Sequence, residues 1–106
     1  MSRDNSFKDF VLDQLGDLPA LACRAMFGGY GLYAGAVFFG IIFRGKLYFK
    51  TSDETRARYL RCRMKPFRPS ATQTLKTYYE IPAEVLEDAE ALAAWARESI
   101  QAAGNA

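Results

Sequence analysis

The apolar and polar positions of the chain repeat with two different periods, which divide it into helices and strands. Apolar residues at positions 7, 10, 11 and 15 recur at helical spacing, and Gly16 follows them. They predict an amphipathic first helix that ends at this glycine. Residues 21–27 alternate as in a strand, and two apolar runs flank Arg44 and Gly45. These runs predict a tight β-hairpin over residues 35–51.

The two-residue turn of this hairpin sets the register of its strands. Phe43 is expected opposite Lys46, and every second side chain then points to the same face of the sheet. One face is expected to carry the core residues Phe38, Ile42, Leu47 and Phe49. The other face mixes apolar and basic side chains: Phe39, Ile41, Phe43, Lys46, Tyr48 and Lys50. Such a mixed face is either covered by a second element or in contact with a partner.

A second helix is expected over residues 52–64. Ser52 is a candidate N-cap, acidic residues occupy the first turn, and Pro66 stops the helix. The spacing of its apolar residues predicts a buried stripe made of Ala57, Leu60 and Met64.

The rest of the chain predicts two strands and a last helix. Residues 66–70 are held extended by two prolines, and residues 74–81 alternate as a strand with Lys76 and Tyr78 on one face. A short helical turn then precedes an amphipathic helix over residues 89–103. The expected fold class is therefore α+β, with two layers, an antiparallel sheet with helices, and the order α-β-β-β-α-β-β-α.

Length and composition predict one soluble domain. The chain has 106 residues, half of them apolar, which suffices for one modest core. No apolar run approaches the ~20 residues that span a membrane, and the N-terminus lacks the apolar stretch of a signal peptide. We expect a cytoplasmic protein without a membrane partner, whose Cys23 and Cys62 are reduced and packed.

The chain contains no histidine. A Ser–His–Asp triad, a Cys–His nucleophile and a His-based zinc site are therefore excluded. A general base would have to be a carboxylate, Lys, Tyr or Cys, and no pair of carboxylates stands out in an apolar setting. We expect no catalytic residues, no metal ligands and no cofactor, and a protein that is not an enzyme.

Four of the eight glycines lie in one stretch, MFGGYGLYAG. A phosphate-binding loop would need Lys and Ser or Thr after its last glycine, and a dinucleotide site would need a helix there. Because a strand follows instead, we interpret the glycines as a bend in a strand around which aromatic rings pack. The alternative is a loop whose exposed Tyr30 contacts a partner. The bend is expected to consist of Gly28, Gly29, Gly31 and Gly35, with Gly31 leaving room for a facing ring or backbone.

The formal net charge of +2 is unevenly distributed. Residues 40–76 contain ten basic and two acidic residues, a net charge of +8, whereas residues 77–106 carry −5. A basic centre of this kind can attract a polyanion. Alternatively, the acidic C-terminal helix folds back beside the basic stretch.

The stretches MFGGYGLY, FRGKLYFKT, TYYEIPAEVLED and WARESI follow one another in this order. Together they resemble the N-terminal domain of TfoX (Sxy), a regulator of competence for DNA transformation. The resemblance covers residues 24–100, and we expect residues 1–106 to form one such domain without the C-terminal domain of larger TfoX proteins. It implies a small α+β domain with a non-enzymatic role in the transcriptional control of DNA uptake.

Two functions are compatible with the mixed face of the predicted sheet. The first is a regulatory interaction module that binds a protein partner or a second copy of itself. The alternative is direct nucleic-acid binding, in which lysines contact phosphates and tyrosines offer stacking surfaces. The candidate surface is the same for both: Phe39, Ile41, Phe43, Lys46, Tyr48, Lys50, Lys76 and Tyr78.

Overall fold

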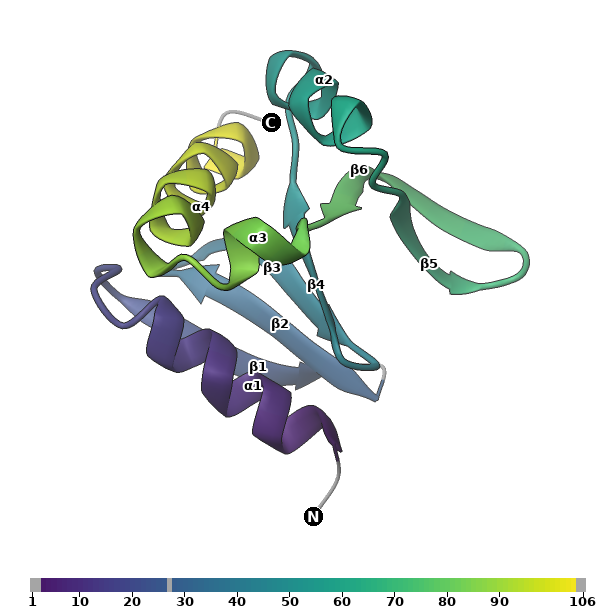
Figure 1. The fold of residues 1–106 in the computed structure, drawn as a ribbon. Coiled ribbons are helices and arrows are strands. Elements are labelled where there is room, and N and C mark those ends of the chain that lie inside the picture. Colours follow the sequence, from purple (N-terminus) through teal and green to yellow (C-terminus); the bar gives the residue numbers. More distant parts are fainter. Residues whose placement is uncertain (1–2, 27, 105–106) are drawn as a thin grey trace.

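The computed structural model describes residues 3–26 and 28–104, and for residues 3–5 it describes the backbone alone. Within these residues the chain forms one six-stranded sheet and four helices (Figure 1). The strands are β1 (Leu21–Met26), β2 (Gly29–Ala34), β3 (Val37–Phe43), β4 (Lys46–Lys50), β5 (Pro66–Ser70) and β6 (Gln73–Glu80). The helices are α1 (Arg3–Gln14), α2 (Asp53–Arg61), α3 (Ala83–Leu86) and α4 (Ala89–Gly104).

Neighbouring strands of the sheet are antiparallel and lie in the order β1-β2-β3-β4-β6-β5. Helices α1, α3 and α4 lie on one face of the sheet (Figure 1). There Val11 of α1 and Leu92 of α4 join Ile42 and Phe49 of the sheet in the main core. The expected α+β class, an antiparallel sheet with helices, is confirmed.

The glycine-rich stretch forms a hairpin, so the sheet has one strand more than the sequence predicted. Met26 pairs with Gly29, and Gly28 adopts a left-handed backbone conformation (φ 78°) in the turn between β1 and β2. The chain therefore reverses direction here instead of bending within one strand. The prediction that Gly31 leaves room for a facing ring is confirmed, since a Cβ atom there would lie 3.0 Å from the ring of Phe38.

A β-bulge in β3 reverses the predicted facing of two phenylalanines. Leu32 pairs with Gly40 but Tyr33 pairs with Phe38, which leaves Phe39 between them as an extra residue. An extra residue shifts the alternation of the strand by one position. Phe39 therefore points into the main core, where it is fully buried, and Phe38 points to the other face. The assignment of Phe39 to the mixed face is wrong.

Ser99 of α4 provides a hydrogen-bond donor to the bulge. Its hydroxyl donates to the backbone carbonyl of Phe39 at 2.9 Å, and the residue is 2 % exposed. We expect Ser99→Ala to lower the free energy of unfolding by about 1–3 kcal/mol, because this buried carbonyl would lose its donor. Urea denaturation measures the change, and Gln101→Ala, at an exposed position of the same helix, is a control expected to be near neutral. Equal stabilities of the two variants would contradict this role of Ser99.

Helix α2 packs beside α4 through a side chain outside the predicted stripe. Tyr59 is buried, with its ring centroid 4.9 Å from that of Trp95 and 6.1 Å from that of Tyr79. Because α2 lies beyond the end of β4 (Figure 1), Tyr59 is its one buried residue.

The predicted stripe of this helix is wrong for Ala57, which is exposed, and for Leu60, which is 54 % exposed. Met64, which follows the helix, is half-buried and packs against the main core, as predicted. Cys62, just after this helix, is also exposed, so the expected packing is wrong for this free thiol.

Candidate interaction surface

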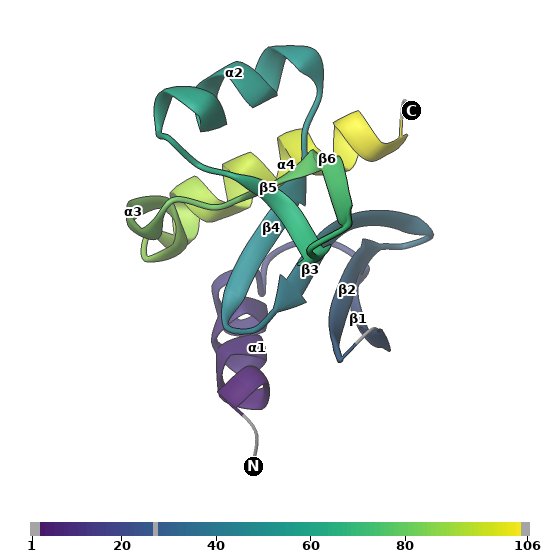
Figure 2. The same ribbon diagram turned by 90° about the vertical axis from the view of Figure 1, so that its right-hand side faces the viewer.

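The hairpin of β5 and β6 folds across the sheet face that the helices leave open. We call this hairpin, residues 66–80, the arm. β6 pairs with β4 on one side and with β5 on the other, and two register shifts interrupt the β5 pairing. The arm crosses in front of β3 and β4 (Figure 2), and its residue Phe67 is fully buried. Its ring centroid lies 5.3 Å from that of Phe43 and 4.8 Å from that of Tyr48.

The arm determines which of the predicted surface residues remain accessible. Half of the eight are buried: Ile41, Tyr48 and Tyr78 in the cluster around Phe67, and Phe39 in the main core. The others are half-buried or exposed: Phe43, Lys46, Lys50 and Lys76. The mixed face is therefore covered in part by a second element, and its accessible remainder lies along the border of the arm.

Burial raises the pKa of two tyrosines on this face. The pKa of Tyr48 lies above its usual 10.0, first because of burial and second because of the Glu80 carboxylate. The pKa of Tyr78 rises to about 12, again through burial first and through Tyr33 second. Both phenols are therefore neutral at physiological pH, where a general base would need a pKa near 7.

A row of aromatic rings crosses the same face beside the arm. Phe38 lies between Tyr33 and Tyr78, with centroid distances of 5.2 and 5.5 Å. A cation covers each end, Arg24 over Tyr33 at 5.3 Å and Lys50 over Tyr78 at 5.4 Å. The sequence did not reveal this row, because Phe38 reaches this face through the bulge alone.

An apolar hollow of 250 Å³ opens where the arm meets the end of β3. Its walls are mostly hydrocarbon, with two polar side chains at the tip of the arm. The guanidinium carbon of Arg44 lies 5.2 Å from the centroid of the Phe43 ring, which is part of the lining. The lining consists of Phe43, Phe67, Pro69, Ser70, Gln73 and Leu75.

A basic hollow of 320 Å³ adjoins the apolar one along β5. Three cations and one carboxylate face it, and the carboxylate of Glu80 lies 3.9 Å from the ammonium of Lys46. The lining consists of Lys46, Tyr48, Lys65, Pro66, Arg68, Thr74 and Glu80. Phe67 and Arg68 are consecutive residues that line different hollows, so the two hollows share β5 as a wall. We call the two hollows together the arm surface.

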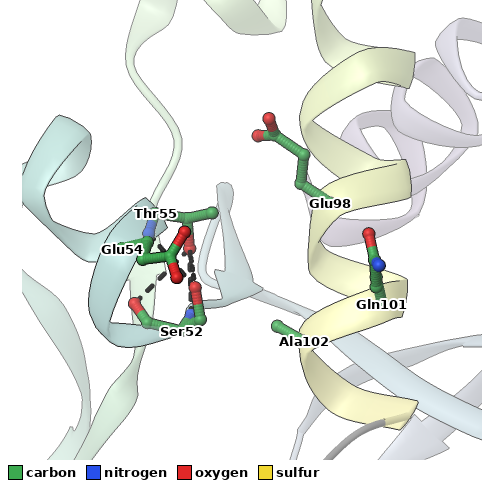
Figure 3. Close-up of a pocket in the computed structure, with 6 residues that line it drawn as sticks. All are labelled: Ser52, Glu54, Thr55, Glu98, Gln101 and Ala102. Atoms are coloured by element: carbon green, nitrogen blue, oxygen red, sulfur yellow. Dashed lines mark hydrogen bonds between the residues drawn. The ribbon is translucent and has the colours of Figure 1, made fainter.

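A third depression, of 470 Å³, separates the start of α2 from the last turns of α4 (Figure 3). Ser52 and Thr55 cap α2 there, each side chain accepting a hydrogen bond from the backbone of the other residue. On the opposite wall, Glu98 forms an ion pair with Arg58. These polar groups already have partners within the protein, so we place the candidate site on the arm surface.

The described residues contain no group of three or more His, Cys, Asp or Glu side chains that could hold a metal ion. No helix in residues 3–26 or 28–104 is long and apolar enough to cross a membrane.

The TfoX N-terminal domain family matches residues 13–103, which is most of the chain. The match includes all six strands of the sheet and reaches from the end of α1 almost to the end of α4. No curated protein matches the chain.

Proposed function

The chain belongs to the TfoX N-terminal domain family, and from this premise we propose that it is a non-enzymatic regulatory domain that binds a protein partner. The family is of a non-catalytic, regulatory type. The proposed setting is the cytoplasm, and the proposed process is the control of competence for DNA transformation, as the resemblance implies.

The arm surface is the observation that carries this proposal. An apolar hollow and a basic hollow share β5 as a wall, and Phe43 and Lys46, which pair with each other, line one hollow each. Protein interfaces combine an apolar centre with charged groups at the border, where the charges select the partner. Half-buried Phe43 and exposed Lys46 place both kinds of group within one hairpin turn.

Direct nucleic-acid binding is the second candidate, supported by charge. Between Thr55 and Tyr79 the chain has seven basic and no acidic residues. Stacking on bases has less support, because Tyr48 and Tyr78 are buried. Anisotropy of labelled duplex DNA at several salt concentrations tests this candidate. Nucleic-acid binding is favoured if the logarithm of the affinity falls linearly with the logarithm of the salt concentration. It is rejected if the protein does not bind the DNA at low salt.

Charge reversal on the arm surface tests the proposed protein-binding function. We expect the double variant Lys65→Glu/Arg68→Glu to lower partner affinity by about tenfold or more, since like charges across an interface are repulsive. The measurement is the transformation frequency of the organism that encodes the protein, after deletion of the gene and complementation with each variant. Arg97→Glu, at an exposed position of α4 beside α1, is the matched control. A folded double variant that complements as well as the control would reject the proposal.

A further inference from the structure

We propose that the arm surface binds an acidic peptide segment of a partner protein that carries one large apolar side chain. The apolar hollow takes this side chain as an anchor, and the basic hollow takes the neighbouring carboxylates. The inference rests on the proposed function, because it names the kind of partner that the same surface recognises.

The apolar hollow fits an anchor side chain by size and by lining. A closed apolar cavity of about 150 Å³ accommodates a benzene molecule, and this open hollow measures 250 Å³. Phe43 and Phe67 meet edge to face, with an angle of 77° between their rings, and form a firm aromatic wall. Ser70 and Gln73 pair across the arm and stand at its mouth. A ring or a branched aliphatic group that enters the hollow leaves water for an apolar environment.

The charges around the hollow select acidic neighbours for the anchor. Lys65 and Arg68 are exposed, and neither forms an ion pair within the part of the chain that the structure describes. The single carboxylate of the basic hollow, Glu80, already lies beside Lys46. Arg44 adds a cation over the ring of Phe43, which lines the apolar hollow. An anchor in this hollow therefore has positive charge nearby, which complements Asp or Glu beside the anchor in the peptide.

The shape of β5 favours recognition through side chains over addition of a strand. β5 is an edge strand, but Pro66 and Pro69 have no N–H to donate to a new neighbour. Two register shifts further disturb its pairing. A peptide therefore gains more from filling the hollows than from backbone hydrogen bonds to this edge.

The burial of the tyrosines favours a peptide over a nucleic acid. Single strands bind by stacking bases on exposed aromatic faces, and Tyr48 and Tyr78 are each 9 % exposed. A duplex presents phosphates to the cations but has no group that fills an apolar hollow of 250 Å³. An acidic peptide with an apolar anchor satisfies both hollows together.

Titration of the isotopically labelled protein with three synthetic peptides tests the inference by NMR. The first has a central Phe flanked by Asp and Glu, the second has Ser in place of Phe, and the third has Lys in place of the acidic residues. We expect the first peptide to shift the amide signals of residues 43–46 and 65–75, and to bind at least about tenfold more tightly than either of the others. No shift at millimolar concentrations, or equal shifts with the Ser peptide, would overturn the inference.

Two variants locate the binding. Gln73→Trp places a ring at the mouth of the apolar hollow and Lys65→Glu/Arg68→Glu reverses its neighbouring charge, so each is expected to weaken binding about tenfold or more. Arg97→Glu is expected to leave it unchanged. Undiminished binding in both arm variants would overturn the proposed site.

If the double variant loses transformation while no peptide binds, the proposed function stands and the peptide inference fails. If the peptide binds and the variant transforms normally, the inference stands and the proposed function fails.

Discussion

Gly29→Ala is expected to destabilise the domain by about 3 kcal/mol or more, at the upper end of the range for overpacking, and to leave much of it unfolded. A Cβ atom at this position would lie 2.2 Å from the carbonyl oxygen of Ile42 and 3.2 Å from the ring of Phe43. The oxygen belongs to the backbone of the neighbouring β3, so the clash is not relieved by turning a side chain. β2 and β3 would have to separate, although the core on both faces of the sheet depends on their pairing.

Urea denaturation followed by circular dichroism measures this loss. Gly104→Ala is the matched control, because a Cβ atom there has no heavy atom within 4 Å and alanine favours the helix. We expect the control to equal or slightly exceed the wild-type stability. A Gly29→Ala protein with the stability of the control would show that β2 and β3 are not as close as the structure has them.

The hairpin of β3 and β4 could be predicted in detail because its determinants are local. Arg44 and Gly45 have φ angles of 51° and 75°, and a turn with two such residues matches the twist of the strands that it joins. The predicted pairing of Phe43 with Lys46 is confirmed. Sequence reasoning succeeds here because turn type and register are fixed within four residues.

The bulge at Phe39 could not be predicted because its stabilising partner is distant in the sequence. Phe38 and Phe39 have the same side chain. The pattern of apolar residues is therefore the same whether Phe38 or Phe39 points into the main core. The hydroxyl that bonds the carbonyl of Phe39 belongs to Ser99, sixty residues further along the chain. The one extra residue of the bulge places Phe38 and Phe39 each on the face of the sheet opposite to the predicted one. Phe39 is therefore no longer part of the predicted surface.

The candidate site was predicted only in part, because some of its residues are placed by a local turn and others by long-range packing. Phe43 and Lys46 were named from the hairpin pattern, and both line the arm surface. Phe67 and Arg68 were missed, because the fold of the arm across β3 and β4 is a long-range packing event. A signal was nevertheless present: two prolines mark an edge strand, and an aromatic residue between them is a candidate for packing over a sheet face.

Phe67→Ala is expected to lower the free energy of unfolding by about 3–5 kcal/mol, because it empties the site of a fully buried ring. The loss concerns the smaller of the two cores, in which this ring contacts Phe43 and Tyr48. The other face keeps its own core around Phe39 and Phe49, whose centroids lie 5.6 Å apart. We therefore expect the arm to loosen while the helical layer and β1–β4 stay folded.

The ionisation of Tyr48 reports this loosening directly. Its pKa lies above 10.0 in the wild type, because burial disfavours the phenolate. Removal of the Phe67 ring admits water, so the pKa of Tyr48 is expected to fall toward 10.0, measured by NMR titration of the tyrosine ring carbons. Tyr59, whose pKa is raised by burial in the opposite core, is the internal control and should not change. An unchanged titration of Tyr48 in a folded Phe67→Ala variant would mean that the arm stays in place without the Phe67 ring, which would contradict the proposed role of this ring.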